Sequence, residues 1–343
     1  MNDRIRWGIL STANINRLLI PQMHHSARSE VQAVASRNLS TATAYAAEWE
    51  IPTAYGSYEA LLNDSKIDVV YIPLPNTLHA EWAVAAANAG KHVLCEKPIV
   101  QTLGDFERAE QAARENNICL VEAFANLHHP QHYVALSLIE SGRIGELQTI
   151  NGWFYFHLSP EKVNNIRLNA ELGGGSLWDL GVYSNALSIF YAGGKAPQSV
   201  WGTRFLGESG VDVTFAGQML FDNRITAQIS CGFKNPPREG LQLVGDAGIL
   251  EILSPHNTTG EHETEFRLTD NVGTQETIVN SPKNSYVAEI EAMEACVLDE
   301  AEPLLPLSLC REFLRTVLAL HESANTNSLI QLRSTEQLYG DRQ

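Results

Sequence analysis

The segment His92-Val-Leu-Cys-Glu-Lys-Pro98 organises the first part of this chain. Its apolar residues, 93–95, are typical of a strand buried on both faces, and they end in a carboxylate, an ammonium and a proline. Pro98 lacks a backbone donor, disfavours the helical conformation for Lys97 and permits a cis peptide bond. We therefore expect Lys97 to stand at the carboxyl end of a buried strand, where ligands bind; an ordinary solvated strand end is the simpler alternative.

Strand and helix patterns alternate on both sides of this segment. Strands are expected at residues 5–10, 31–36, 68–72 and 118–123, and helices at 15–23, from Ser40 onward, at 57–62, 76–89 and 102–115. This alternation predicts a parallel, doubly wound sheet. The expected fold class for residues 1–125 is an α/β domain of the Rossmann, doubly wound type.

Beyond about residue 147 the period changes to alternation of apolar and polar residues. About six such strands are expected between residues 147 and 269, followed by helices at 285–298 and 307–322. This pattern predicts an α+β domain, residues 126–343, with a large, mostly antiparallel sheet that has one face solvated or covered by a partner.

Composition excludes several classes of partner. The chain has 343 residues and a formal net charge of −16, from 24 Lys+Arg against 40 Asp+Glu, which argues against nucleic acid and anionic membranes. A small-molecule substrate is the better expectation. The five cysteines contain no C-x-x-C pair, and no apolar signal segment precedes the first strand, so we expect a cytoplasmic protein.

The first strand leads into Ser11-Thr12-Ala13-Asn14-Ile15, where a phosphate group would bind. A strand that feeds a helix presents backbone N–H groups and the positive dipole end to an anion. The spacing matches the fingerprint G-x-G-x-x-G, yet Ser11, Ala13 and Asn16 occupy the glycine positions. Small residues at 11 and 13 still let a pyrophosphate approach the backbone. The segment is therefore interpreted either as a cofactor site or as a generic strand–helix turn.

The end of the second strand indicates which nucleotide binds. An acidic residue there would bind the ribose 2′-OH, whereas an arginine would meet a 2′-phosphate. The chain reads Ser36-Arg37 without a carboxylate, which favours NADP over NAD. NAD remains the alternative if Arg37 is only a solvated side chain.

Six segments occur in the order typical of one enzyme family. They are residues 7–15, 36–37, 74–79, 96–98, 122–124 and 173–183. Together they resemble the glucose–fructose oxidoreductase / inositol dehydrogenase family (Gfo/Idh/MocA), in the branch of dimeric dihydrodiol dehydrogenases and NADP-dependent D-xylose dehydrogenases. The resemblance implies that residues 1–125 bind NAD(P) and that the open-faced sheet of residues 126–343 binds substrate and a second copy of the chain, in a homodimer or tetramer. The implied reaction is hydride transfer at a hydroxyl-bearing carbon of a carbohydrate-like substrate, which is a sugar, polyol or dihydrodiol. It also implies cofactor contacts from Leu74, Pro75, Asn76, His79, Glu96 and Lys97.

The same resemblance places Lys97 beside the reacting oxygen. Gly173 to Gly175 precede an expected helix that carries Asp179 and Tyr183 one turn apart, on one face. Tyr183 replaces the histidine of many relatives. A free phenol has a pKa of about 10, and the Lys97 ammonium would lower the pKa of Tyr183. Tyr183 is therefore the expected proton-transfer residue, and Asp179 would orient it. The alternative is that Tyr183 is a core aromatic.

Other candidates carry weaker signals. Arg167 and Trp178 flank the glycine run and are assigned to substrate contacts, although Arg167 would equally pair with an acid and Trp178 pack in the core. His128, His129 and His132 have partial metal-ligand spacing, but no acidic or Cys ligand completes the set, so no metal site is expected.

Two other functions compete with the dehydrogenase. A redox-neutral hydrolase with tightly bound NAD would favour an acidic residue after the second strand and a secretion signal. A nucleotide sensor without catalysis would not need both Lys97 and Tyr183. The sequence favours the oxidoreductase.

Overall fold

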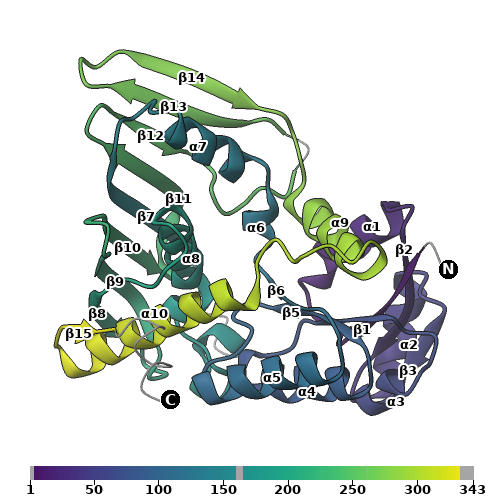
Figure 1. Ribbon diagram of the computed structural model, residues 1–343. Helices are drawn as coiled ribbons and strands as arrows, with labels where there is room; N and C mark the ends of the chain where they lie inside the picture. Colours follow the sequence, from purple (N-terminus) through teal and green to yellow (C-terminus); the bar gives the residue numbers. More distant parts are fainter. Residues whose placement is uncertain (1–3, 160–164, 261, 333–343) are drawn as a thin grey trace, which may run out of the picture. The chain divides into compact units, whose positions relative to one another are not determined.

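The computed structural model describes residues 4–159, 165–260 and 262–332, and these form two compact units (Figure 1). The first unit contains residues up to 128 together with 284–310, and the second contains residues 129–283 with those from 311 onward. A late segment of the chain is therefore part of the first unit.

The first unit is built on a parallel sheet with the order β3-β2-β1-β4-β5-β6 among the described residues. The strands are β1 Ile5–Leu10, β2 Ser29–Ala35, β3 Thr53–Tyr55, β4 Val69–Ile72, β5 His92–Glu96 and β6 Leu120–Ala123. The helices are α1 Asn16–His25, α2 Leu39–Glu48, α3 Tyr58–Leu62, α4 His79–Asn88 after the short η1 Asn76–Leu78, α5 Leu103–Glu115, α6 Ala125–His128 and α9 Ser285–Leu298. This sheet confirms the predicted Rossmann architecture.

Local signals set most helix starts in this unit. Ser57 accepts a hydrogen bond from the Ala60 amide, and Thr102 accepts one from the Asp105 amide, as their cap positions predict. The prediction that α2 opens at Ser40 is wrong. The Asn38 side chain caps this helix by accepting from the Ser40 amide at 2.8 Å, so the helix begins at Leu39.

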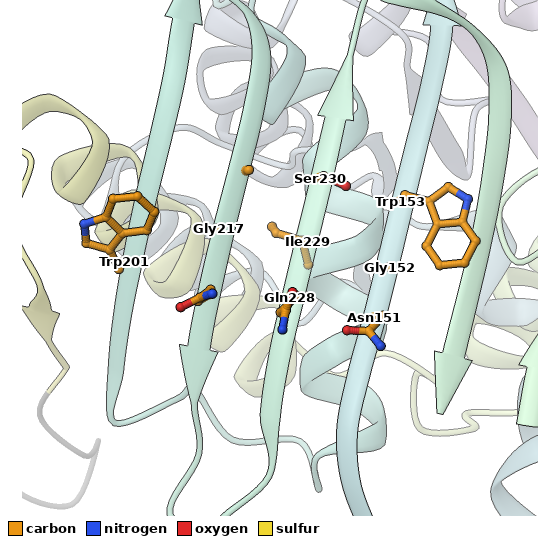
Figure 2. Close-up of a pocket in the computed structure, with 10 residues that line it drawn as sticks. Asn151, Gly152, Trp153, Trp201, Gly217, Gln228, Ile229 and Ser230 are labelled. Carbon is orange, nitrogen blue, oxygen red and sulfur yellow. The ribbon is translucent and has the colours of Figure 1, made fainter. Parts of the chain in front are cut away.

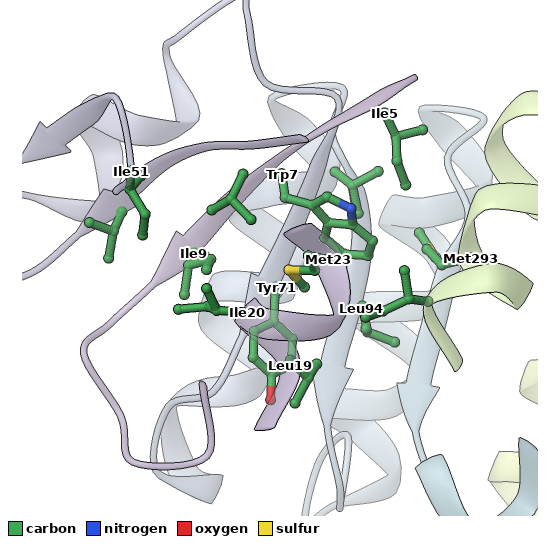
Figure 3. Packing of buried hydrophobic residues seen from close by; sticks show 14 of the residues in the cluster. Ile5, Trp7, Ile9, Leu19, Ile20, Met23, Ile51, Tyr71, Leu94 and Met293 are labelled. Carbon is green, nitrogen blue, oxygen red and sulfur yellow. The ribbon is translucent and has the colours of Figure 1, made fainter. Parts of the chain in front are cut away.

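One hydrophobic cluster of the first unit lies between the sheet and helices α1, α2 and α9 (Figure 3). Trp7 is fully buried and its indole N–H donates to Ser29 Oγ at 2.9 Å. Ile290 and Met293 of α9 join the same cluster as Tyr71 and Leu94 of the sheet. Burial of these side chains explains why α9, distant in sequence, belongs to this unit.

The second unit contains a sheet with the order β14-β13-β12-β11-β7-β10-β9-β8-β15 in the described part of the chain. The strands are β7 Leu147–His157, β8 Ser199–Leu206, β9 Asp212–Leu220, β10 Thr226–Gly232, β11 Lys234–Gly245, β12 Gly248–Ile252, β13 Thr264–Asp270, β14 Gln275–Asn280 and β15 Ile330–Gln331. All neighbours are antiparallel except β7 and β10, which confirms the predicted sheet type. The expectation of about six strands was too low, because the alternating segment 241–253 contains part of β11 and all of β12, β14 is mostly exposed and β15 has two residues.

Helices cover one face of this sheet. The remaining elements are α7 Gln131–Glu140, the short η2 Ile166–Leu168 and η3 Ala170–Leu172, the π-helical η4 Leu177–Gly181, α8 Val182–Tyr191 and α10 Leu307–Thr326. A Cβ on Gly152 of β7 would lie 3.0 Å from Cβ of Ser184, so α8 packs directly on the sheet at this glycine. No helix among the described residues has the length and apolar character needed to cross a bilayer.

Candidate active site

Four expected site segments follow neighbouring strands of the parallel sheet. Ser11 follows β1, Arg37 follows β2, Leu74 follows β4 and Lys97 follows β5, and these strands are adjacent in the order β2-β1-β4-β5. The strand order reverses between β1 and β4. Ligands of open α/β sheets bind at such a switch point, outside the carboxyl ends of the strands.

The turn after β1 has a backbone that normally needs glycine. Ser11 has φ 122°, in the left-handed region, at the first position of the fingerprint. Its hydroxyl donates to Pro73 O at 3.2 Å and accepts from the Ala13 amide at 3.2 Å. Ser11 therefore adopts the glycine-like turn and also ties it to the end of β4.

No side chain caps the start of α1. Its N-cap, Ile15, provides no side-chain hydrogen bond, and the amides of Asn16, Arg17 and Leu18 donate to the carbonyls of Ala13, Asn14 and Ile15. Asn16, at the third glycine position, is fully buried and donates to Ser11 O at 2.9 Å. The loop from Ser11 to Ile15 thus makes a tight turn with other residues in the glycine positions, and its contact with a phosphate stays a prediction.

At the end of β2, Arg37 is exposed and Ser36 is half-buried. The Ser36 amide donates to Tyr55 O, while Asn38 is used as the cap of α2. The charged side chain at this strand end is therefore a cation, as the sequence predicts for a 2′-phosphate.

The peptide bond between Lys97 and Pro98 is cis. Before it, the Glu96 carboxylate accepts a hydrogen bond from the Tyr71 hydroxyl at 2.7 Å. The fully buried His79 has one ring nitrogen 2.8 Å from Pro98 O and the other 2.8 Å from Leu74 O. Burial lowers the pKa of His79, and the two carbonyls oppose that shift. His79 therefore links the Leu74 loop to the Lys97 segment, and a direct cofactor contact by His79 stays a prediction.

In the second unit, the glycine run positions Asp179. A Cβ on Gly174 would lie 2.5 Å from Arg167 O, and Gly175 has φ 124°, so neither position tolerates a side chain without displacement. This close approach brings Arg167 Nε to 2.6 Å from Asp179 Oδ2, and the guanidinium also lies over Phe156, 5.9 Å from the ring centroid.

The helix that carries Asp179 and Tyr183 is not a single α-helix. Asp179 lies in the π-helical turn and Tyr183 in the first turn of α8. Inserted π turns are frequent at functional sites, and the periodicity of the sequence does not reveal them. Trp178 is buried and lies 6.3 Å from the His321 ring, so most of its surface is packed.

Tyr183 packs against two aromatic rings of its own unit. Its ring centroid lies 5.7 Å from that of Phe154 and 5.7 Å from that of His256, and these two rings stack at 4.7 Å. Burial lowers the pKa of His256 to about 3, so its imidazole is neutral. The sequence analysis missed His256, because it stands in an irregular segment after β12 with no motif around it.

The histidines near residue 130 have separate roles. His132 contacts the Tyr191 hydroxyl at 2.9 Å and Pro255 O at 3.1 Å, and burial lowers its pKa to about 3. Burial also lowers the pKa of His128 to about 4, and that ring contacts Phe124 O. The described residues contain no group of three or more His, Cys, Asp or Glu side chains arranged to hold a metal.

The face of the second sheet that lies opposite α8, here named the outer face, is hollowed (Figure 2). A depression of about 540 Å³ is lined by residues of β7, β8, β9 and β10. Trp153 and Trp201 stand at its sides, and Asn151 and Gln228 lie between them. Amides and aromatic side chains therefore share this face.

Both parts of the chain match models of one family. Residues 5–124 match the oxidoreductase family with an NAD-binding Rossmann fold, and residues 134–251 match the GFO/IDH/MocA C-terminal domain.

Individual proteins match over most of their length. D-xylose 1-dehydrogenase (NADP(+)) 2 of Haloferax volcanii is 35% identical over 95% of this chain and 99% of its own. Trans-1,2-dihydrobenzene-1,2-diol dehydrogenase of Xenopus laevis is 32% identical over 73% of this chain and 75% of its own. A solved 3-ketoreductase of Actinomadura kijaniata, in complex with NADP and TDP-benzene, has TM-score 0.85 and 28% identity over 94% of this chain and 97% of its own. The chain therefore belongs to the GFO/IDH/MocA family of oxidoreductases.

Proposed function

We propose that this chain is an NADP-dependent oxidoreductase that transfers a hydride between the nicotinamide and a hydroxyl-bearing or carbonyl carbon of a sugar, polyol or dihydrodiol. The observation that carries the proposal is the position of Lys97 after β5, beside the switch point of the sheet, with Pro98 O bound by the buried His79. The names of the matched xylose and dihydrodiol dehydrogenases and of the matched ketoreductase support this substrate class.

The residues of the first unit fit NADP. The uncapped start of α1 and the glycine-like Ser11 suit a pyrophosphate, and the exposed Arg37 suits a 2′-phosphate. Leu74, Pro75 and Asn76 follow the next strand, at the same edge. When bound, NADP supplies or accepts the hydride. A matched solved structure that contains NADP supports this choice over NAD.

Side chains of this chain would bind the reacting oxygen and transfer the proton. Lys97 would hold the reacting oxygen, and the Tyr183 hydroxyl would pass a proton to or from it. Asp179, held by Arg167, would orient a substrate hydroxyl. Solved variants of the Actinomadura kijaniata reductase include replacements of a lysine and of a tyrosine, which is consistent with this pair. Lys97 and Tyr183 belong to different units, so their meeting stays a prediction.

We further infer that the chain is cytoplasmic and self-associates through the outer face of the second sheet. Trp201 is 37% exposed and Phe205 is 72% exposed on β8, beside the depression that holds Trp153. Aromatic residues are enriched at protein interfaces, and a two-fold dimer is the simplest closed assembly.

A direct test is a screen of the purified protein with NADP+ and NADPH against aldoses, anhydro-ketoses, 3-keto sugars and dihydrodiols, followed by nicotinamide absorbance. We expect turnover in at least one class and weaker activity with NAD+ or NADH. No turnover in any class, while NADPH binds tightly in calorimetry, would favour the sensor instead.

A further inference from the structure

Glu122 is a buried carboxyl group next to the Lys97 segment. It lies on β6, where it pairs in register with Cys95 of β5, and it is 3% exposed. Its Oε1 accepts a hydrogen bond from the Ile99 amide at 2.8 Å. Ile99 is two residues beyond Lys97, so this side chain binds the segment that presents the lysine.

The second oxygen of this carboxyl lies in a different environment. Oε2 is buried and has no hydrogen-bond partner within the described ranges. The titratable groups that face Glu122 are Lys97 and Glu96 at the end of β5 and the Cys310 thiol. Burial raises the pKa of Glu122 to about 7, while hydrogen bonds from the Ile99 amide and the Cys310 thiol, and the charge of the Lys97 ammonium, oppose the rise. This carboxyl therefore changes its charge close to neutral pH.

The two residues after Lys97 are each fixed by one buried side chain. His79 contacts Pro98 O, and Glu122 accepts from the Ile99 amide. The proline cannot donate a hydrogen bond, so the Ile99 amide is the first donor after Lys97 that can anchor the segment.

We propose that Glu122 is a positioning residue that holds Lys97 in its productive place, and that it does so more firmly as a carboxylate than as a neutral acid. This inference rests on the proposed role of Lys97. As a carboxylate, Glu122 makes a charge-assisted hydrogen bond to Ile99 and faces the Lys97 ammonium with an opposite charge. As a neutral acid it offers a weaker acceptor and no counter-charge.

A purely structural role predicts something different. A glutamine at this position would accept the same hydrogen bond from Ile99 without the cost of burying a charge. If Glu122 only filled the core, Glu122→Gln would leave catalysis unchanged at every pH. If Glu122 positions Lys97 through its charge, this variant behaves at every pH as the wild type does when Glu122 is protonated.

The test compares Glu122→Gln with Glu294→Gln across pH. Glu294 is another buried acid of the first unit, 2% exposed, and it accepts hydrogen bonds from Ser26 and Ser29, so its variant is a matched control. For each variant, kcat/KM is divided by the wild-type value at the same pH, which cancels titrations of other groups. For Glu122→Gln we expect a ratio near 1 well below pH 7 that falls roughly tenfold well above it. The Glu294→Gln ratio should stay flat.

A second measurement does not depend on activity. In protein labelled with ¹³C at glutamate carboxyls, one resonance should titrate near pH 7 and be missing from Glu122→Gln. A resonance that titrates as an ordinary glutamate, or a flat Glu122→Gln ratio, would overturn the proposal. If Lys97→Ala keeps full activity while the carboxyl resonance titrates as expected, the proposed role of Lys97 fails instead.

Discussion

Arg167 Nε donates a hydrogen bond to Asp179 Oδ2 at 2.6 Å, which joins the segment before the glycine run to the π-helical turn after it. The Arg167 side chain is 40% exposed, whereas that of Asp179 is 15% exposed. An ion pair this exposed contributes little to stability, so we expect its role to be the orientation of the Asp179 carboxylate.

The first prediction separates these two residues. Asp179→Asn should lower kcat/KM roughly 10- to 100-fold, because a misoriented substrate reacts slowly. Arg167→Gln should cost less, since it acts through Asp179, and the double variant should resemble Asp179→Asn. Steady-state kinetics of the three variants checks this. Losses that multiply in the double variant would show that Arg167 meets the substrate directly.

Tyr183→Phe tests the proton-transfer role. A phenylalanine keeps the ring contacts with Phe154 and His256, both at 5.7 Å, so the fold should be retained. We expect kcat to fall roughly 10²- to 10⁴-fold with NADPH affinity unchanged, and the titration of the phenol to vanish from the pH–rate profile. Lys97→Ala should be at least as damaging. Near-full turnover of Tyr183→Phe would leave Asp179, or a water held by Lys97, as the proton donor.

The sequence predicted elements wherever one local signal dominates. Buried strands such as β4 and β5, and caps such as Ser57 and Thr102, follow from apolar runs and hydroxyl side chains alone. The cap of α2 was misplaced because Asn38 and Ser40 are both good caps two residues apart, and only the backbone geometry selects Asn38.

Tertiary contacts at the site escaped prediction for a physical reason. Glu122 and His79 act on the Lys97 segment through hydrogen bonds between residues 19 to 23 positions apart. His256 reaches Tyr183 from more distant sequence still. None of these contacts leaves a periodic pattern, and the π-helical turn before α8 obeys neither the helical nor the strand period.

Arg37 should decide between the two nicotinamide cofactors. Arg37→Asp removes a charge-assisted contact with a 2′-phosphate and supplies an acceptor for a ribose 2′-OH. NADPH binding should weaken by roughly 1.5–3 kcal/mol, and the relative affinity for NADH should rise. Isothermal calorimetry with both cofactors measures this directly. Unchanged NADPH affinity would show that the exposed Arg37 is only a solvated side chain.

Assembly through the outer sheet face is tested with a charge. Trp201→Arg places a cation at the depression on this face, and its burial against a partner would weaken a dimer at least about tenfold. Val272→Arg is a control, because Val272 is 82% exposed in the turn between β13 and β14, outside the depression. Light scattering at micromolar concentration should give twice the 37.8 kDa of one chain for the wild type and the control. A wild-type mass of 37.8 kDa contradicts the prediction.

The last prediction concerns stability and follows from the protonation of Glu122. Its pKa rises from an ordinary 4.5 to about 7 in the folded protein, mainly through burial. Between these values the folded state binds a proton that the unfolded state has lost, so this group's contribution is fully present below about pH 4.5 and is lost as pH rises to about 7. The loss amounts to about 3 kcal/mol above pH 7. Glu122→Gln does not titrate, so the difference in free energy of unfolding between this variant and the wild type should change in favour of the variant by about 3 kcal/mol between about pH 4.5 and about pH 7. Above about pH 7 the difference should stay constant. Urea unfolding of the two proteins at a series of pH values measures the difference. A difference independent of pH would mean that Glu122 ionises normally and is better solvated than its burial indicates.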